Sequence, residues 1–416
     1  MIRVLVWATH LQTDILALAL HLDACEDVAL MVVTPGLATF RAEPIARACP
    51  FAAPLLDRDD PDTPERARRF GADVVVADNH VAPPGLAPRL FYMWHGLGWK
   101  ARGRLDLRVF YHQVRRLTGI DPRRPNPAFR AQCYGPHDRA WRMRNWHLPA
   151  DACAEIGMTF SDLLLDPPYD KRAVAKNYRI DVIGRPTVLL AITWHYGGIF
   201  SAAGSAARML RGIPGDTQMN PVDLHFLNRM VETVRARGAN LLICLHDRKR
   251  YDAAFLHAIE ALVAPHSFVE VRFKDRHPDN LSDLLVADVM VSNLSSFLAY
   301  HYVLRRPAVH IRPADPDVSR IERRIMLFSR FPLRLWSYAD DAWMLDPTDV
   351  AGPIVRDAEE AAAAVAAALA DPESGREATG EWLARHVTGI DGKTAARFKR
   401  ELERLCAAPA PGTPAG

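Results

Sequence analysis

Short apolar runs alternate with segments of helical periodicity along most of the chain. In the first part, strands are expected at 2–7, 28–33, 72–77 and 89–94, with helices at 13–22 and 63–70. The pattern restarts near residue 186, with strands expected at 187–193, 240–245, 268–273, 289–292 and 308–311. Helices are expected between and after them at 223–237, 252–263, 281–287, 297–303, 358–369 and 394–405. Near-continuous apolar strands that alternate with helices predict parallel sheets covered on both faces.

This repeated pattern predicts an α/β protein with two Rossmann-like domains that face each other across a cleft. We expect an N-terminal domain at 1–165, a linker at 166–185 and a C-terminal domain at 186–405 that includes the closing helices. The Ala/Pro/Gly-rich tail 406–416 is expected to be disordered. Ligands of such folds bind outside the carboxyl ends of strands, so the residues that follow strands are the candidates for function.

The composition excludes several classes of protein. The chain has 416 residues, of which 49% are hydrophobic and 24% charged, which is typical of a globular protein and not of a fibre or a disordered chain. The chain has 52 Lys and Arg residues and 49 Asp and Glu residues, so any strongly basic surface must be a local patch. The six cysteines form no CxxC pair, and Cys25 and Cys244 are expected to be buried.

The N-terminal sequence predicts a cytoplasmic protein. The first residues lead directly into the first strand, with no basic segment and no cleavage pattern. The apolar run Ile15–Leu20 is too short to span a bilayer. Peripheral contact with the inner face of the membrane stays open.

The first candidate for chemistry follows the expected strand 89–94. His95 stands between Trp94 and Gly96, and an imidazole at a strand end can act as a general base near neutral pH. Lys100 can add positive charge for a phosphate. The alternative is a structural turn in which the histidine has an ordinary hydrogen-bond partner.

Two further candidates follow strands of the second repeat. His246 ends the apolar run 241–245 and could donate to a diphosphate, although a single histidine there can equally be structural. After strand 289–292, Ser295 and Ser296 can begin a helix whose N–H groups and hydroxyls bind an anion. The alternative is a helix cap without a ligand.

A basic stretch between residues 100 and 130 interrupts the first repeat. It contains nine cations with only two acids and includes interleaved aromatic residues, which suits an anionic lipid surface or a polyphosphate. No nucleic-acid motif accompanies it, so no nucleic-acid partner is expected. An ordinary solvated helix and loop is the alternative. The cations are Lys100, Arg102, Arg104, Arg108, Arg115, Arg116, Arg123, Arg124 and Arg130.

Common catalytic motifs are absent from the sequence. The chain contains no GxGxxG, GxxxxGK[ST], HExxH or GxSxG pattern, so dehydrogenases, P-loop NTPases, zincins and α/β-hydrolases lose support. No carboxylates occur at metal-ligand spacing. The sequence therefore requires no cofactor or metal, and a dependence on Mg²⁺ stays open.

The candidate motifs, in this order, resemble those of the CDP-glycerol glycerophosphotransferase family, the teichoic-acid primases and polymerases. The resemblance covers roughly residues 90–400 and includes the family's Trp-His-Gly-x-x-x-Lys motif. It departs from the family at Thr159, Phe160, His195 and Asn293, which indicates a divergent branch. The matching residues are Trp94, His95, Gly96, Lys100, Gly157, Asp162, Thr193, Trp194, Leu245, His246, Ala287, Asp288, Ser292, Ser295, Ser296, Arg306 and Pro307.

The resemblance implies a type-B glycosyltransferase fold and a phosphotransferase that acts in cell-wall or capsule polymer synthesis. Glycerol phosphate, or another polyol phosphate, would pass from CDP-glycerol or another nucleotide-activated donor to a glycan or lipid-linked acceptor. CMP would be released. His95 would be the base. The resemblance implies donor-phosphate contacts from His246, Asn293, Ser295, Ser296 and Lys100, and substrate contacts from Trp94, Gly96, Thr193 and His195.

Two alternatives remain open. The same fold could transfer a sugar from a nucleotide sugar, since fold does not fix chemistry. The departures from the family motifs also allow a catalytically degenerate homologue that binds nucleotide or polymer.

Overall fold

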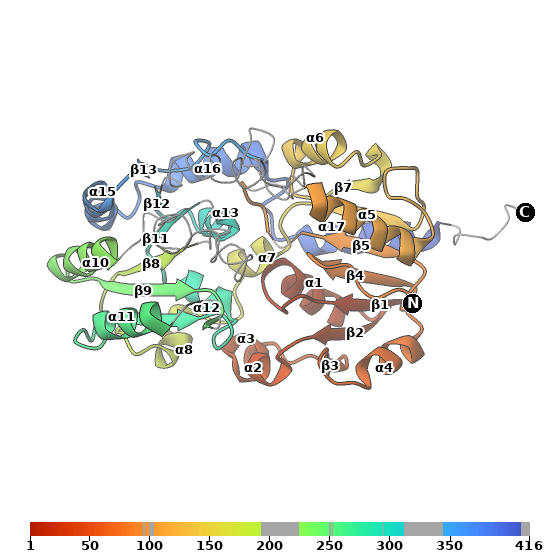
Figure 1. The fold of residues 1–416 in the computed structure, drawn as a ribbon, viewed down its shortest axis with the longest axis horizontal. Coiled ribbons are helices and arrows are strands. Elements are labelled where there is room, and N and C mark those ends of the chain that lie inside the picture. The colour runs from red at the N-terminus through yellow and green to blue at the C-terminus, as the bar shows by residue number, and fades with distance from the viewer. Residues whose placement is uncertain are drawn as a thin grey trace, which may run out of the picture.

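A computed structural model describes residues 1–94, 96–99, 104–192, 224–248, 251, 253–293, 295–311 and 344–408. The chain forms two parallel sheets of seven and six strands, each flanked by helices (Figure 1). The expectation of an α/β protein with two parallel sheets is therefore confirmed.

The first sheet has the strand order β3-β2-β1-β4-β5-β6-β7, and every adjacent pair is parallel. Its central strands are continuous apolar runs, because helices cover both faces and exclude water from them. The strands are β1 (Ile2–Trp7), β2 (Val28–Thr34), β3 (Leu55–Asp57), β4 (Val74–Asp78), β5 (Leu90–Met93), β6 (Phe129–Cys133) and β7 (Cys153–Glu155). The helices of this part are α1 (Thr13–Asp23), α2 (Leu37–Ala42), α3 (Pro44–Ala48), α4 (Thr63–Phe70), α5 (Arg104–Thr118), α6 (Pro136–Asn145) and α7 (Phe160–Leu165). The short helix α8 (Lys171–Val174) follows them and lies beside the second sheet (Figure 1).

The second sheet has the order β10-β9-β8-β11-β12-β13 and is also parallel. Its strands are β8 (Thr187–Ala191), β9 (Asn240–Leu245), β10 (Val269–Phe273), β11 (Val289–Ser292), β12 (Ala308–Ile311) and β13 (Ile354–Val355). Its helices are α10 (Leu224–Ala236), α11 (Ala253–Val263), α12 (Asn280–Val286), α13 (Ser296–Val303) and α15 (Ala358–Ala370), followed by α16 (Arg376–His386) and α17 (Thr394–Ala407).

The last helix lies on the first sheet, although it follows the second sheet in sequence. In Figure 1 α17 runs beside β5, among the elements of the first part of the chain. The ring of Phe398 lies 4.2 Å from that of Phe91 in β5, and Lys399 pairs with Asp27 at 2.6 Å. The chain therefore crosses from the second sheet back to the first. The domain limits expected from the sequence stay a prediction.

Several expected features differ in detail. Strand β6 was not predicted, because polar residues alternate with apolar ones in it; Gln132 is nevertheless buried and donates to the Gly157 carbonyl at 2.7 Å. The six cysteines are free, but Cys25 is only half-buried, not buried as expected. Helix α17 continues through Ala407, two residues into the expected disordered tail. None of the described helices is long and apolar enough to cross a bilayer.

Candidate active site

A pocket opens at the carboxyl ends of β8, β9 and β10, next to the starts of α12 and α13. It encloses about 390 Å³, part of which is open to solvent. The strand order reverses direction between β8 and β11, and ligands of open parallel sheets bind at such a switch point. The lining residues are Ala191, Ile192, Cys244, His246, Arg272, Phe273, Lys274, His277, Asn280, Asp283, Ser295 and Phe297.

The start of helix α13 contributes an anion-binding group to this pocket. Ser295 is the N-cap, and its Oγ accepts the Phe297 N–H at 3.2 Å. Its hydroxyl proton can then be donated to a ligand oxygen, and the first N–H groups of the helix carry partial positive charge. Because Ser295 and Phe297 both line the pocket, this helix end suits a phosphate.

Lys274 and His246 also line the pocket, and each follows a strand of the second sheet. Lys274 directly follows β10, and its ammonium lies 5.7 Å from the ring centre of Phe297. His246 follows β9, and its backbone N–H donates to the Tyr251 hydroxyl at 3.1 Å. The sequence analysis selected His246 but missed Lys274. Lys274 directly follows a predicted strand, so the search for functional residues after strands could have found it.

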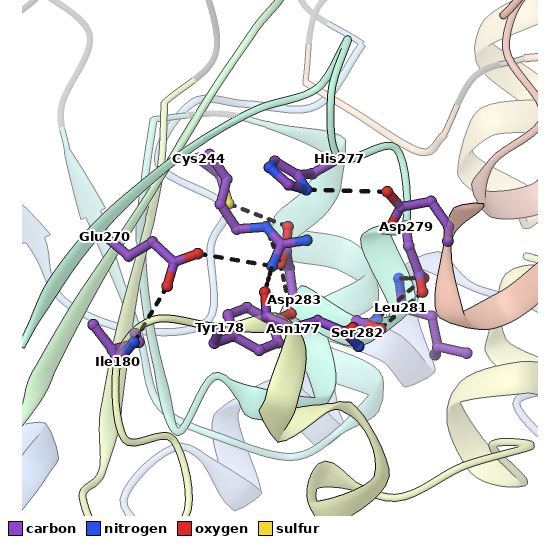
Figure 2. A network of polar contacts seen from close by, with 12 residues as sticks. Asn177, Tyr178, Ile180, Cys244, Glu270, His277, Asp279, Leu281, Ser282 and Asp283 are labelled. Carbon is purple, nitrogen blue, oxygen red and sulfur yellow. Dashed lines mark hydrogen bonds and ion pairs between the residues drawn. The ribbon is translucent and has the colours of Figure 1, made fainter. Parts of the chain in front are cut away.

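Arg272 also lines the pocket, but two carboxylates already balance its charge. Its Nε lies 3.4 Å from Asp283 Oδ1, its Nη1 lies 3.9 Å from Glu270 Oε1, and only 3% of the side chain is exposed. The guanidinium lies 4.4 Å from the ring centre of Tyr178, whose hydroxyl donates to Asp283 at 2.7 Å. Figure 2 shows Glu270, Asp283, Tyr178 and Cys244 drawn together in this network. Arg272 therefore supports the floor of the pocket, and Lys274 contributes positive charge beside it.

The first domain reaches the rim of the pocket through short contacts. Asn280 Nδ2 donates to Gln12 Oε1 at 3.0 Å, and the Ile45 N–H donates to Asp279 Oδ2 at 3.3 Å. Glu43 Oε1 lies 4.0 Å from His277 Nδ1. Burial, reinforced by the nearby Asp279 charge, raises the pKa of Glu43 to about 7. The pocket thus lies where the two domains meet.

Some of the expected site residues can be placed in the structure. His246 and Ser295 share the pocket, while Ser296 lies against Gly96 of the first domain. Trp94 packs edge-on against Trp146, with ring centres 5.7 Å apart. The expected residues that lie outside the described part of the chain are His95, Lys100, Thr193 and His195.

Asn293 belongs to the expected donor contacts but does not line the pocket. It directly follows β11 and its side chain is fully buried. Its contact with the donor phosphate stays a prediction.

Other motif residues have structural partners. The carboxylate of Asp162 accepts the N–H groups of Thr394 and Ala395 at 3.1 and 2.8 Å, so it caps α17. Gly157 has φ +102°, and a Cβ there would lie 2.3 Å from the Thr388 carbonyl oxygen. Arg306 donates to the Ala287 carbonyl at the end of α12 at 2.6 Å. Asp162 and Gly157 therefore join the first part of the chain to its last part, and Arg306 joins two neighbouring elements of the second sheet.

The described side chains offer no ready metal site. No group of three or more His, Cys, Asp or Glu residues in the described ranges is arranged to hold a metal ion.

Known structures resemble this chain much more clearly than known sequences do. No protein-family model matches the chain, and no curated protein sequence matches it either. The wall teichoic acid polymerase TagF superposes with a TM-score of 0.65 at 12% identity, covering 97% of this chain and 88% of that chain. A TagF variant soaked with CDPG gives a TM-score of 0.63 at 11% identity, with coverage of 97% and 88%.

Two further solved structures have the same architecture. A putative UDP-N-acetylglucosamine 2-epimerase from Listeria monocytogenes gives a TM-score of 0.55 at 12% identity, covering 97% of this chain and 96% of that chain. S. aureus MnaA, in a co-structure with UDP, gives 0.53 at 11% identity and 99% coverage of both chains. The chain therefore has the type-B glycosyltransferase fold that its motifs predicted, a fold it shares with TagF and MnaA.

Proposed function

We propose that the protein is a transferase that moves glycerol phosphate, or a related polyol phosphate, from a CDP-activated donor. The acceptor is a hydroxyl of a cell-surface glycan or a lipid-linked molecule, and CMP is released. The ordered motifs and the fold shared with TagF support this choice among transferases of the same architecture.

The pocket at the switch point of the second sheet is the observation that carries the proposal. Ser295 at the start of α13, the ammonium of Lys274 and the imidazole of His246 line one pocket. Together they offer hydroxyl, N–H and cationic donors to the oxygens of a diphosphate. Asn293, Ser296 and Lys100 complete the proposed donor contacts. Trp94, Gly96, Thr193 and His195 are proposed to contact the donor or the acceptor.

The proposed reaction is a displacement at phosphorus. The acceptor oxygen attacks the phosphorus that carries the glycerol, and the bond from that phosphorus to the bridging oxygen of CMP breaks. His95 takes the acceptor proton, because a neutral imidazole with a pKa near 6.5 is a suitable base at neutral pH. Lys274 and the start of α13 stabilise the charge that develops on CMP. Phosphoryl transfer depends mainly on such positioning and charge stabilisation.

A donor screen tests the function directly. The full chain is incubated with CDP-glycerol, CDP-ribitol or UDP-glucose plus a polyol-phosphate acceptor, and the released CMP or UDP is measured. We expect CMP release from a CDP-polyol. Because Lys274→Ala removes a charge-assisted contact, we expect it to weaken donor affinity about tenfold. His95→Ala should abolish CMP release while the thermal stabilisation by CDP persists.

The exposed Lys176 is the matched control for Lys274, and Lys176→Ala should bind CDP as the wild type does. Selective stabilisation and turnover with UDP-glucose would contradict the proposed donor and favour sugar transfer. Stabilisation by nucleotide without release from any donor would contradict transferase activity and favour the binding homologue. An active His95→Ala protein would remove His95 from the proposed role.

The basic stretch 100–130 is proposed to hold the protein at the inner face of the membrane, where a lipid-linked acceptor would be found. Arg108, Arg115 and Arg116 lie exposed on α5, while Phe110 and Val114 on the same helix are buried. The helix therefore presents a basic face to the solvent, which suits an anionic lipid surface.

A further inference from the structure

Asp14 lies outside the pocket and has no role in the proposed chemistry, yet its buried carboxylate joins several segments of the chain. It is the second residue of α1 and is 1% exposed. Its Oδ2 accepts the hydroxyls of Tyr300 at 2.6 Å and Tyr134 at 3.2 Å. Its Oδ1 accepts the Phe160 N–H at 2.8 Å and the Thr159 hydroxyl at 3.2 Å. Tyr300 belongs to α13, whereas the other donors belong to the first domain.

Tyr134 connects this carboxylate to the turn that follows β5. The Gly96 N–H donates to the Tyr134 hydroxyl at 2.9 Å. The hydroxyl proton of Tyr134 is shared between the Trp94 carbonyl at 2.9 Å and Asp14 Oδ2. One buried hydroxyl therefore fixes the backbone on both sides of residue 95.

Tyr300 connects the same carboxylate to the helix that begins at the pocket. A Cβ placed on Gly96 would lie 2.8 Å from Ser296 Cβ and 3.0 Å from the Tyr300 hydroxyl oxygen, so the two chain segments touch. Gly96 also has φ +123°, which residues with a side chain rarely adopt. Only a glycine allows the turn to approach α13 so closely.

Strained backbone lies next to Asp14. Thr13 has φ +48°, an outlier for a β-branched residue. Such strain persists only where the surrounding structure over-determines it, and it is concentrated at functional sites. This observation is independent of the hydrogen bonds to the carboxylate, and it points to the same place.

We propose that Asp14 is the positioning residue of the active site: through Tyr134 it holds the Trp94 and Gly96 backbone, and through Tyr300, in the second turn of α13, it holds that helix. This inference rests on the proposed function, because the two segments carry the acceptor and donor sides of that reaction. A displacement of about 1 Å between reacting groups can cost about 100-fold in rate. The expected defect is therefore in turnover and not in donor binding.

Asp14→Asn, Tyr134→Phe and Tyr300→Phe test this proposal. In Asp14→Asn, the side-chain NH2 group would face hydroxyl or N–H groups that are themselves donors. Each Tyr→Phe change deletes one bridging hydroxyl. We expect kcat for CMP release to fall about 10–100-fold in each variant, while the donor KM changes by less than about threefold. Tyr92→Phe is the matched control: it deletes a buried hydroxyl in β5, which donates to the Asn79 carbonyl at 3.1 Å.

Amide hydrogen exchange gives a second readout that needs no activity. In the two Tyr→Phe variants, the peptides spanning 94–99 and 295–300 should exchange faster than in the wild type and in Tyr92→Phe. If kcat in Tyr134→Phe and Tyr300→Phe stays equal to that in Tyr92→Phe at matched thermal stability, the network is only structural and the proposal is wrong. Unchanged exchange at both peptides would contradict it too. A wild-type protein that releases no CMP would instead overturn the proposed function, even if exchange responds as expected.

Discussion

Arg272 in β10 and Lys274, which follows this strand, show how the surroundings of a cation decide its role. Arg272 points into a network with Asp283 and Glu270, so its charge is balanced inside the protein. Lys274 directly follows the carboxyl end of the strand and lines the pocket. The residue types alone would suggest the opposite choice, because arginine is the more common phosphate ligand in bidentate sites. Position relative to the strand end is the better guide here.

The buried carboxylate of Asp78 predicts a pH dependence of stability. Asp78 ends β4 and its Oδ1 accepts the Thr9 N–H at 2.6 Å, but burial raises its pKa from an ordinary value near 3.8 to about 7. Because the pKa of Asp78 is raised in the folded state, its carboxyl group stabilises the fold below about pH 4, and this stabilisation is lost as the pH rises to about 7. We expect Asp78→Asn to remove this loss. Between pH 4 and 8, its free energy of unfolding should therefore rise by roughly 2–4 kcal/mol relative to that of the wild type.

Urea unfolding at a series of pH values measures this difference. Asp59→Asn, which removes an exposed carboxylate, is the control and should run parallel to the wild type. A constant difference between Asp78→Asn and the wild type from pH 4 to 8 would show that Asp78 is ionised in the folded protein throughout that range.

At the scale of elements, helix α5 carries the proposed membrane contact. Its solvent side holds Arg108, Arg115 and Arg116, and Val109 beside them is 48% exposed. Each cation near an anionic surface contributes about 1 kcal/mol, so replacing all three with Ser should weaken vesicle binding roughly 100-fold at low salt. Co-sedimentation with vesicles of phosphatidylglycerol and phosphatidylcholine, repeated at rising salt, measures this binding.

Helix α4 offers a matched control for that experiment. Arg66, Arg68 and Arg69 are exposed on it, and replacing all three with Ser changes the net charge by the same amount. If the α4 and α5 variants lose binding equally, the effect comes from net charge and not from the face of α5. A wild-type protein that stays in the supernatant at low salt would contradict membrane contact altogether.

At the scale of the whole molecule, the crossing of α17 to the first sheet couples the end of the chain to its beginning. Phe398 is fully buried and packs on Phe91, so Phe398→Ala should destabilise the first domain by about 3–5 kcal/mol. Hydrogen exchange should quicken in β1, β4 and β5 while β8 and β9 keep their protection. Phe226→Ala, in α10 on the second sheet, is the control and should show the reverse distribution. Faster exchange confined to the second sheet in Phe398→Ala would contradict this coupling.

The sequence alone determined the elements whose pattern is local. The apolar strand 240–245 and the strand 308–311 were predicted with the bounds that the structure has, because buried parallel strands read as continuous apolar runs. The start of α13 was predicted from Ser295 and Ser296, because a helix cap depends only on neighbouring residues. His246 was found as a residue that follows a strand.

Only the tertiary structure decided which distant residues meet. Asp14 reads in the sequence as an ordinary acidic residue at a helix start, and nothing local connects it with Tyr134 or Tyr300. The return of α17 to the first sheet and the capping of that helix by Asp162 are equally invisible in local patterns. Periodicity reports which face of an element is buried but not which element covers it, because that choice depends on the packing of the whole chain.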